Sequence, residues 1–111
     1  MAAFAVGDVG LVKFPFSDLS HAKLRPAIVL AAAEKGDWIL CQVTSNPFGD
    51  SQAIEITEQD LAQGFLQKVS YARPAKLFTA NLRIIVRKVG SLKAQKRHQL
   101  IRSVKALFQH D

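Results

Sequence analysis

The chain has 111 residues, of which 49% are hydrophobic and 22% are charged, and its formal net charge is +6. This length allows one domain with one modest core, and the hydrophobic share excludes a chain that is disordered by composition. No run approaches the roughly 20 apolar residues that a membrane-spanning helix needs. We therefore expect a single domain over residues 1–111 without a membrane segment.

The N-terminus and the cysteine content favour the cytoplasm. The first residues lack the basic start and the apolar stretch of a signal peptide. Cys41 is the only cysteine, so it cannot form an intrachain disulfide, and it lies in an apolar stretch. We expect a cytoplasmic protein in which Cys41 is a buried structural thiol.

Charge is distributed unevenly along the chain. Residues 66–111 carry +10, whereas residues 1–65 carry −4. Such an asymmetry favours a polyanionic partner, for example nucleic acid, on the C-terminal half. The alternative is a solvated helix face, because five of these cations fall on the predicted terminal helix: Lys93, Lys96, Arg97, Arg102 and Lys105.

The first half of the chain is predicted to form strands. Residues 8–14 form the first strand, and a polar loop follows it to Leu24. Residues 25–31 form the second strand, with Pro26 at its start, where a missing N–H is tolerated. A turn at residues 34–37 leads to a third strand at 38–44, so the second and third strands are expected to pair as an antiparallel hairpin.

The second half mixes short strands with helical segments. A short strand is predicted at 52–56, and a helix begins at Thr57 and stops at Gly64. Extended pieces are predicted at 68–73 and 76–79 around Pro74, while residues 83–89 remain ambiguous up to Gly90. Apolar residues recur at spacings of three and four from Leu100 to Phe108, which predicts a terminal helix. Together these elements indicate a mainly β (α+β) fold: a small curled sheet or barrel with a C-terminal α-helix.

Several kinds of catalytic site find no support in the sequence. The chain has no Cys/His cluster for zinc, no glycine-rich nucleotide-binding loop, and only scattered acids, which do not form a two-metal nuclease site. His21 lies in the predicted loop before the second strand and is a candidate acid or base. The alternative interpretation is that His21 is an exposed loop residue without a catalytic role.

A guanidinium group and two hydroxyls are placed at the ends of neighbouring predicted strands. Arg25 begins the second strand, and Thr44 and Ser45 end the third. Arginine binds phosphate oxygens bidentately, and RNA supplies its own nucleophile, the 2′-hydroxyl. If the two strands are neighbours, Arg25 and Thr44 face the same phosphodiester. The alternative interpretation is that Arg25 has only a structural role at the start of the strand.

Six segments, in this order, resemble the MazF/PemK growth-inhibitor toxins. They are GDVGLV (7–12), FPFSDLS (14–20), KLRPAIVL (23–30), VTS (43–45), SYARPAKLFT (70–79) and RKVGSL (87–92). The resemblance covers essentially the whole chain and includes a helix after the last segment.

The resemblance implies an SH3-like barrel of the PemK/CcdB type that forms a homodimer and needs no cofactor or metal. It implies a sequence-specific endoribonuclease that cleaves single-stranded mRNA and leaves a 2′,3′-cyclic phosphate and a 5′-hydroxyl. It also implies an acidic, MazE-like antitoxin. By position the catalytic residues are Arg25, Thr44 and Ser45, assisted by His21. RNA-binding residues are expected at Lys23, Asn46, Arg73 and Lys76.

One departure from the family's sequence pattern, at Ala75, leaves other functions open. Some relatives carry a carboxylate where this chain has Ala75, so activity is expected either to rest on Arg25, Thr44 and His21 or to be attenuated. One alternative is a gyrase-inhibiting, CcdB-like toxin, although the terminal Leu-Phe-Gln-His stretch lacks the expected aromatic signature. The other is a catalytically silent RNA-binding barrel.

Overall fold

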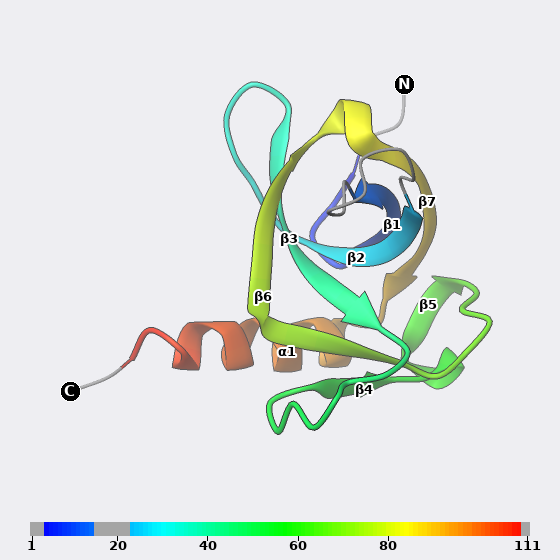
Figure 1. The fold of residues 1–111 in the computed structure, drawn as a ribbon, viewed down its shortest axis with the longest axis vertical. Helices are drawn as coiled ribbons and strands as arrows, with labels where there is room; N and C mark the ends of the chain where they lie inside the picture. Colours follow the sequence, from blue (N-terminus) through cyan, green and yellow to red (C-terminus); the bar gives the residue numbers. More distant parts are fainter. Residues whose placement is uncertain (1–3, 15–22, 110–111) are drawn as a thin grey trace.

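A computed structural model describes residues 4–14 and 23–109 of the chain. Within these residues, seven strands form one antiparallel sheet that curls on itself, and helix α1 packs against β6 and β7 at one end of it (Figure 1). The strand order is β4-β6-β3-β2-β1-β7-β5. The elements are β1 (Asp8–Phe14), β2 (Lys23–Ala32), β3 (Asp37–Thr44), β4 (Ile54–Ile56), η1 (Glu58–Asp60), β5 (Leu61–Gly64), β6 (Ser70–Asn81), η2 (Leu82–Ile84), β7 (Ile85–Leu92) and α1 (Ala94–Ala106).

The predicted mainly β fold with a C-terminal helix is confirmed, as is the antiparallel pairing of the second and third strands. Among the described residues no helix is both long and apolar enough to cross a bilayer.

The core has two layers because the central strands are buried on both faces. On β2, Ile28 belongs to one apolar cluster, whereas Ala27 and Val29 belong to the other. Successive side chains of a strand point to opposite faces, so this continuous apolar run fills both layers. Leu100 of α1 belongs to the same cluster as Ile28, which anchors the helix to the sheet.

Cys41 is buried in β3, as predicted. Its Sγ lies 3.1 Å from the backbone oxygen of Arg73, to which it donates a hydrogen bond. Burial raises the pKa of the thiol to about 12 because the low dielectric disfavours the thiolate. Cys41 is therefore protonated and unreactive in the folded protein.

Two predictions for the second half were wrong. The helix predicted to run from Thr57 to Gly64 is a single 3-10 turn, η1, because residues 61–64 pair with β7 as strand β5. The two extended pieces around Pro74 are one continuous strand, β6. Pro74 is tolerated there because the pairing of β3 with β6 shifts register between Cys41 and Val43, which leaves a bulge around the proline.

Gly64 permits the close approach of β5 to β7. Its φ is +89°, and a Cβ at this position would collide with the backbone of Val89 and Gly90. Gly49 has a similar φ of +74°, but a Cβ there would meet nothing within 4 Å. Substituting each glycine by alanine therefore separates two losses of stability: the strain of a positive φ, present at both positions, and the steric clash, present only at Gly64.

We predict that Gly49→Ala lowers the free energy of unfolding by about 1–2 kcal/mol, the usual cost of a left-handed conformation. Gly64→Ala should cost a further ~1–3 kcal/mol because the backbone of β7 must also move. Urea denaturation of both variants measures the difference. Equal losses of stability would contradict the tight contact between β5 and β7.

An ion pair ties the loop between β3 and β4 to strand β6. Asp50 accepts a hydrogen bond from Arg73, with 2.9 Å between Oδ2 and Nε. Its other oxygen, Oδ1, accepts one from the amide of Gln52 at 2.9 Å. The bond from Arg73, followed by the amide of Gln52, lowers the pKa of the Asp50 carboxyl below its ordinary value.

A carboxyl whose pKa is lowered by folding stabilises the protein above its unfolded-state pKa, and that contribution disappears as the pH falls through the folded pKa. We therefore predict that Asp50→Asn melts at a lower temperature than the wild type at pH 7, and that the gap narrows below about pH 4. Melting temperatures between pH 7 and pH 3 measure this. Glu34→Gln removes an exposed carboxylate and is the control; a gap for Asp50→Asn that does not vary with pH would contradict the role of the ion pair.

Candidate functional site

A cavity of about 520 Å³ lies where the start of β2, the end of β3, the middle of β7 and the segment after β5 meet. We call it the Arg25 pocket. Its charged and hydroxyl-bearing lining residues are Lys23, Arg25, Thr44, Ser45, Lys68, Ser70 and Arg87.

Strand pairing explains why Arg25 and Thr44 meet. Ala27 of β2 lies opposite Gln42 of β3, and continuing this register by two residues places Arg25 opposite Thr44. Because side chains alternate along a strand, Arg25 shares a face of β2 with Ala27 and Val29, which are buried. Arg25 lies at the exposed end of that face. The guanidinium group is thus positioned by a rigid strand and remains accessible to solvent.

A second arginine reaches the pocket from the other side of β1. In β1, Val12 pairs with Arg25 of β2, and the preceding residue, Leu11, pairs with Arg87 of β7. Arg87 was not predicted as a site residue because residues 83–89 have no clear periodicity. The pairing of β7 with β1 brings Arg87 near β2, and the cavity lining identifies it as a candidate.

The segment between β5 and β6 contributes the other lining residues that the sequence analysis missed. Gln67 and Lys68 lie in this segment, and Ser70 begins β6 directly after it. No sequence signal singled out Gln67 and Lys68, since their approach to the pocket depends on the pairing of β5 with β7.

The hydroxyl of Thr44 takes part in a local turn. Its Oγ1 accepts a hydrogen bond from the amide of Asn46 at 3.1 Å and lies 3.0 Å from the Asn46 carbonyl oxygen, to which it donates. The side chain of Asn46 in turn accepts from the amide of Phe48 at 3.0 Å. These bonds fix the exit of β3, so that Thr44 and the exposed Ser45 hold defined positions at the pocket.

The electrostatic character of the Arg25 pocket is uniform. Its described lining residues include four cations (Lys23, Arg25, Lys68 and Arg87) and no carboxylate or histidine. Such a set of lysine ammonium and arginine guanidinium groups beside hydroxyls binds phosphate oxygens.

The other predicted site residues lie elsewhere. His21 falls outside the residues that the structure describes. Asn46, Arg73 and Lys76 do not line the Arg25 pocket. Arg73 is paired with Asp50, while Lys76 and Ala75 are exposed on β6. In the described part of the chain, no three His, Cys, Asp or Glu residues are grouped as ligands for a metal ion.

Solved structures with the same fold include MazF toxins. The Mycobacterium tuberculosis toxin MazF-mt6 is 17% identical, with a TM-score of 0.71 over 94% of this chain and 98% of that chain. MazF from Deinococcus radiodurans is 17% identical, with a TM-score of 0.75 over 97% and 98%. A mycobacterial endoribonuclease in complex with its cognate antitoxin is 10% identical, with a TM-score of 0.75 over 98% and 99%. Among curated proteins no sequence matches this chain.

At such low identities the structures establish the fold, and family membership rests on the sequence. The family model of PemK-like, MazF-like toxins of type II toxin–antitoxin systems matches residues 5–108, nearly the whole chain. The resemblance seen in the sequence is thereby confirmed, and the protein belongs to the PemK-like, MazF-like toxin family.

Proposed function

We propose that this toxin is a metal-independent, sequence-specific endoribonuclease that cleaves single-stranded mRNA in the Arg25 pocket. One observation carries the proposal: Arg25, Arg87 and the hydroxyls of Thr44 and Ser45 line a single cavity whose described lining has no acid. Such a cavity suits a phosphodiester anion. Single-stranded RNA exposes both its backbone and its bases to a protein surface.

The proposed reaction uses the substrate's own nucleophile. The 2′-oxygen forms a bond to phosphorus while the bond from phosphorus to the 5′-oxygen breaks. The products are a 2′,3′-cyclic phosphate and a 5′-hydroxyl, and no water is consumed. Arg25 and Arg87 stabilise the negative charge that develops on the phosphoryl oxygens, and the hydroxyls of Ser45 and of Thr44, which exchanges its bond to the Asn46 carbonyl, donate to the non-bridging oxygens.

The reaction also moves a proton from the 2′-hydroxyl to the leaving 5′-oxygen. Arginine is a poor base because its pKa exceeds about 12. We assign this proton transfer to His21, which precedes Lys23 by two residues. His21 lies outside the residues that the structure describes, so this assignment rests on the resemblance to the family and on the ability of an imidazole to accept and donate a proton near neutral pH.

Other residues bind the flanking RNA in this proposal. Lys23 contacts a neighbouring phosphate, and Asn46 and Lys76 contact the strand beyond the pocket. Arg73 contributes less because a phosphate must compete with Asp50 for its guanidinium group. Ala75 lies outside the pocket, so the missing carboxylate is proposed to attenuate cleavage rather than abolish it.

The partner protein is proposed to be an acidic, MazE-like antitoxin. Similar folds include MazE–MazF from Deinococcus radiodurans and the mycobacterial endoribonuclease with its antitoxin. An acidic segment is attracted to the four cations of the Arg25 pocket and would exclude RNA from it. We further propose that residues 1–111 form one domain, and that the toxin acts as a homodimer in the cytoplasm.

We predict that the purified toxin cleaves a long single-stranded RNA at defined sequences in the presence of EDTA. The products should carry 2′,3′-cyclic phosphate and 5′-hydroxyl ends, and a 2′-deoxy nucleotide at the cleaved linkage should block the reaction. Gel electrophoresis and end-group analysis measure both. Binding without cleavage would identify a silent RNA-binding barrel, and gyrase inhibition without either would identify a CcdB-like toxin.

We predict that Arg25→Ala lowers the cleavage rate about 10²–10³-fold, the usual effect of removing a group that stabilises transition-state charge. Arg25→Lys should recover part of this rate because it keeps the charge but not the bidentate geometry. Circular dichroism should be unchanged because Arg25 is exposed.

Arg83→Ala is the matched control, since Arg83 is exposed on η2 and does not line the Arg25 pocket. It removes the same charge and should cleave at the wild-type rate. A folded Arg25→Ala variant that cleaves as fast as Arg83→Ala would refute the role of Arg25.

A further inference from the structure

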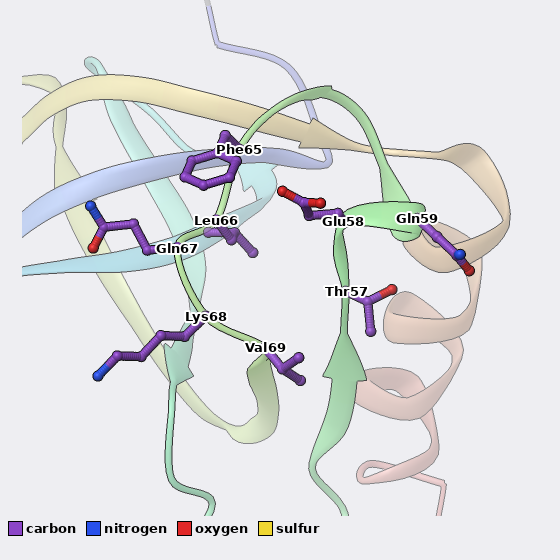
Figure 2. Close-up of a pocket in the computed structure, with 8 residues that line it drawn as sticks. All are labelled: Thr57, Glu58, Gln59, Phe65, Leu66, Gln67, Lys68 and Val69. Atoms are coloured by element: carbon purple, nitrogen blue, oxygen red, sulfur yellow. The ribbon is translucent and has the colours of Figure 1, made fainter.

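A second cavity, of about 580 Å³, lies between the η1 turn and the segment that joins β5 to β6 (Figure 2). We call it the Glu58 pocket. In Figure 2 the Glu58 carboxylate extends toward Phe65 and Leu66, whereas Gln59 extends the other way, toward α1. Thr57 and Val69 complete the lining near Glu58. The lining thus combines one carboxylate and three apolar side chains with the cation Lys68 and the polar residues Thr57, Gln59 and Gln67.

The Glu58 pocket and the Arg25 pocket share a wall. Residues 65–68 line both cavities. Figure 2 shows the side chains of Gln67 and Lys68 extending away from Glu58, while Leu66 lies on the Glu58 side. An RNA strand with a phosphate in the Arg25 pocket therefore needs to cross only this short protein segment to reach the Glu58 pocket.

The two cavities differ in charge. The described lining of the Arg25 pocket has four cations and no acid, whereas Glu58 adds a carboxylate on the other side of the wall. Among residues 4–14 and 23–109, no group donates a hydrogen bond to this carboxylate. A carboxylate repels phosphate and accepts hydrogen bonds from N–H groups. The Glu58 pocket therefore suits a group that presents N–H donors and carries no negative charge.

The apolar lining suits the flat face of an aromatic ring. Phe65 is 60% exposed and Val69 is 47% exposed, so both offer apolar surface to a ligand. Stacking on an aromatic side chain is the usual way in which proteins hold an unpaired base. A nucleobase is a flat ring with N–H donors on its edge, and it therefore fits this lining.

We propose that the Glu58 pocket binds a guanine base of the same RNA strand whose phosphate occupies the Arg25 pocket. This inference rests on the proposed ribonuclease function. The Watson–Crick edge of guanine carries two adjacent donors, N1–H and the N2 amino group, which match the two oxygens of one carboxylate. Adenine, cytosine and uracil each present a single donor position on that edge. Glu58 is therefore a specificity-determining residue.

The test compares guanine with inosine, which lacks the N2 amino group. A randomised RNA library, cleaved in EDTA and sequenced, first locates the position near the cut where guanine is preferred. The rate of cleavage is then measured on two oligonucleotides that carry guanine or inosine at this position. Binding is measured in parallel by fluorescence anisotropy with 2′-O-methyl versions, which cannot be cleaved.

For the wild type we expect guanine to be favoured over inosine about tenfold in both assays, as for one bidentate base contact. Glu58→Gln should reduce this ratio to about one because an amide accepts only one of the two hydrogen bonds. Glu55→Gln is the matched control: Glu55 is exposed on β4 and does not line the pocket. It should keep the tenfold preference.

The outcomes separate this inference from the proposed ribonuclease function. Cleavage without a guanine preference, or a preference that Glu58→Gln retains or Glu55→Gln also loses, overturns the guanine site and leaves the ribonuclease intact. Binding that favours guanine through Glu58 but produces no cleavage supports the site and overturns the ribonuclease. If Glu58→Gln leaves RNA recognition unchanged and weakens only the binding of an acidic antitoxin, the pocket serves a protein and the inference is wrong.

Discussion

The central constraint on this molecule is the pairing of β1 with β2 on one side and β7 on the other. This pairing lets Arg25 and Arg87 line one cavity, although the two arginines come from opposite halves of the chain. Strands hold their backbones rigidly because both neighbours share their hydrogen bonds. The site therefore gains preorganised charge from the sheet itself, and its loops need only complete the lining.

The first strands and the last helix could be predicted because their apolar periodicity is local. Arg25 and Thr44 were recognised for the same reason, since each lies at the end of such a strand. Arg87 and Lys68 could not be found in this way, because their place in the Arg25 pocket follows from β7 joining β1 and β5 joining β7. Pro74 misled the prediction because a bulge in the pairing of β3 with β6 accommodates a residue that usually ends a strand.

Net charge along the sequence was an incomplete guide to the binding surface. The cations of α1 made the C-terminal half strongly basic, yet the described lining of the Arg25 pocket contains none of them. Its four cations come equally from the two halves: Lys23 and Arg25 from the first, Lys68 and Arg87 from the second. Folding thus concentrates positive charge at a place that the linear distribution does not indicate. Long-range attraction of a polyanion by α1 and local binding in the pocket are separate effects.

Cys41 provides a built-in reporter on the integrity of the barrel. It is the only thiol of the chain, and it lies beneath the junction of β3 and β6 with its proton held by burial. A maleimide can therefore alkylate only those molecules in which the core around Cys41 has opened. The rate of alkylation counts such openings directly, without any engineered label, in the free toxin and in its complexes alike.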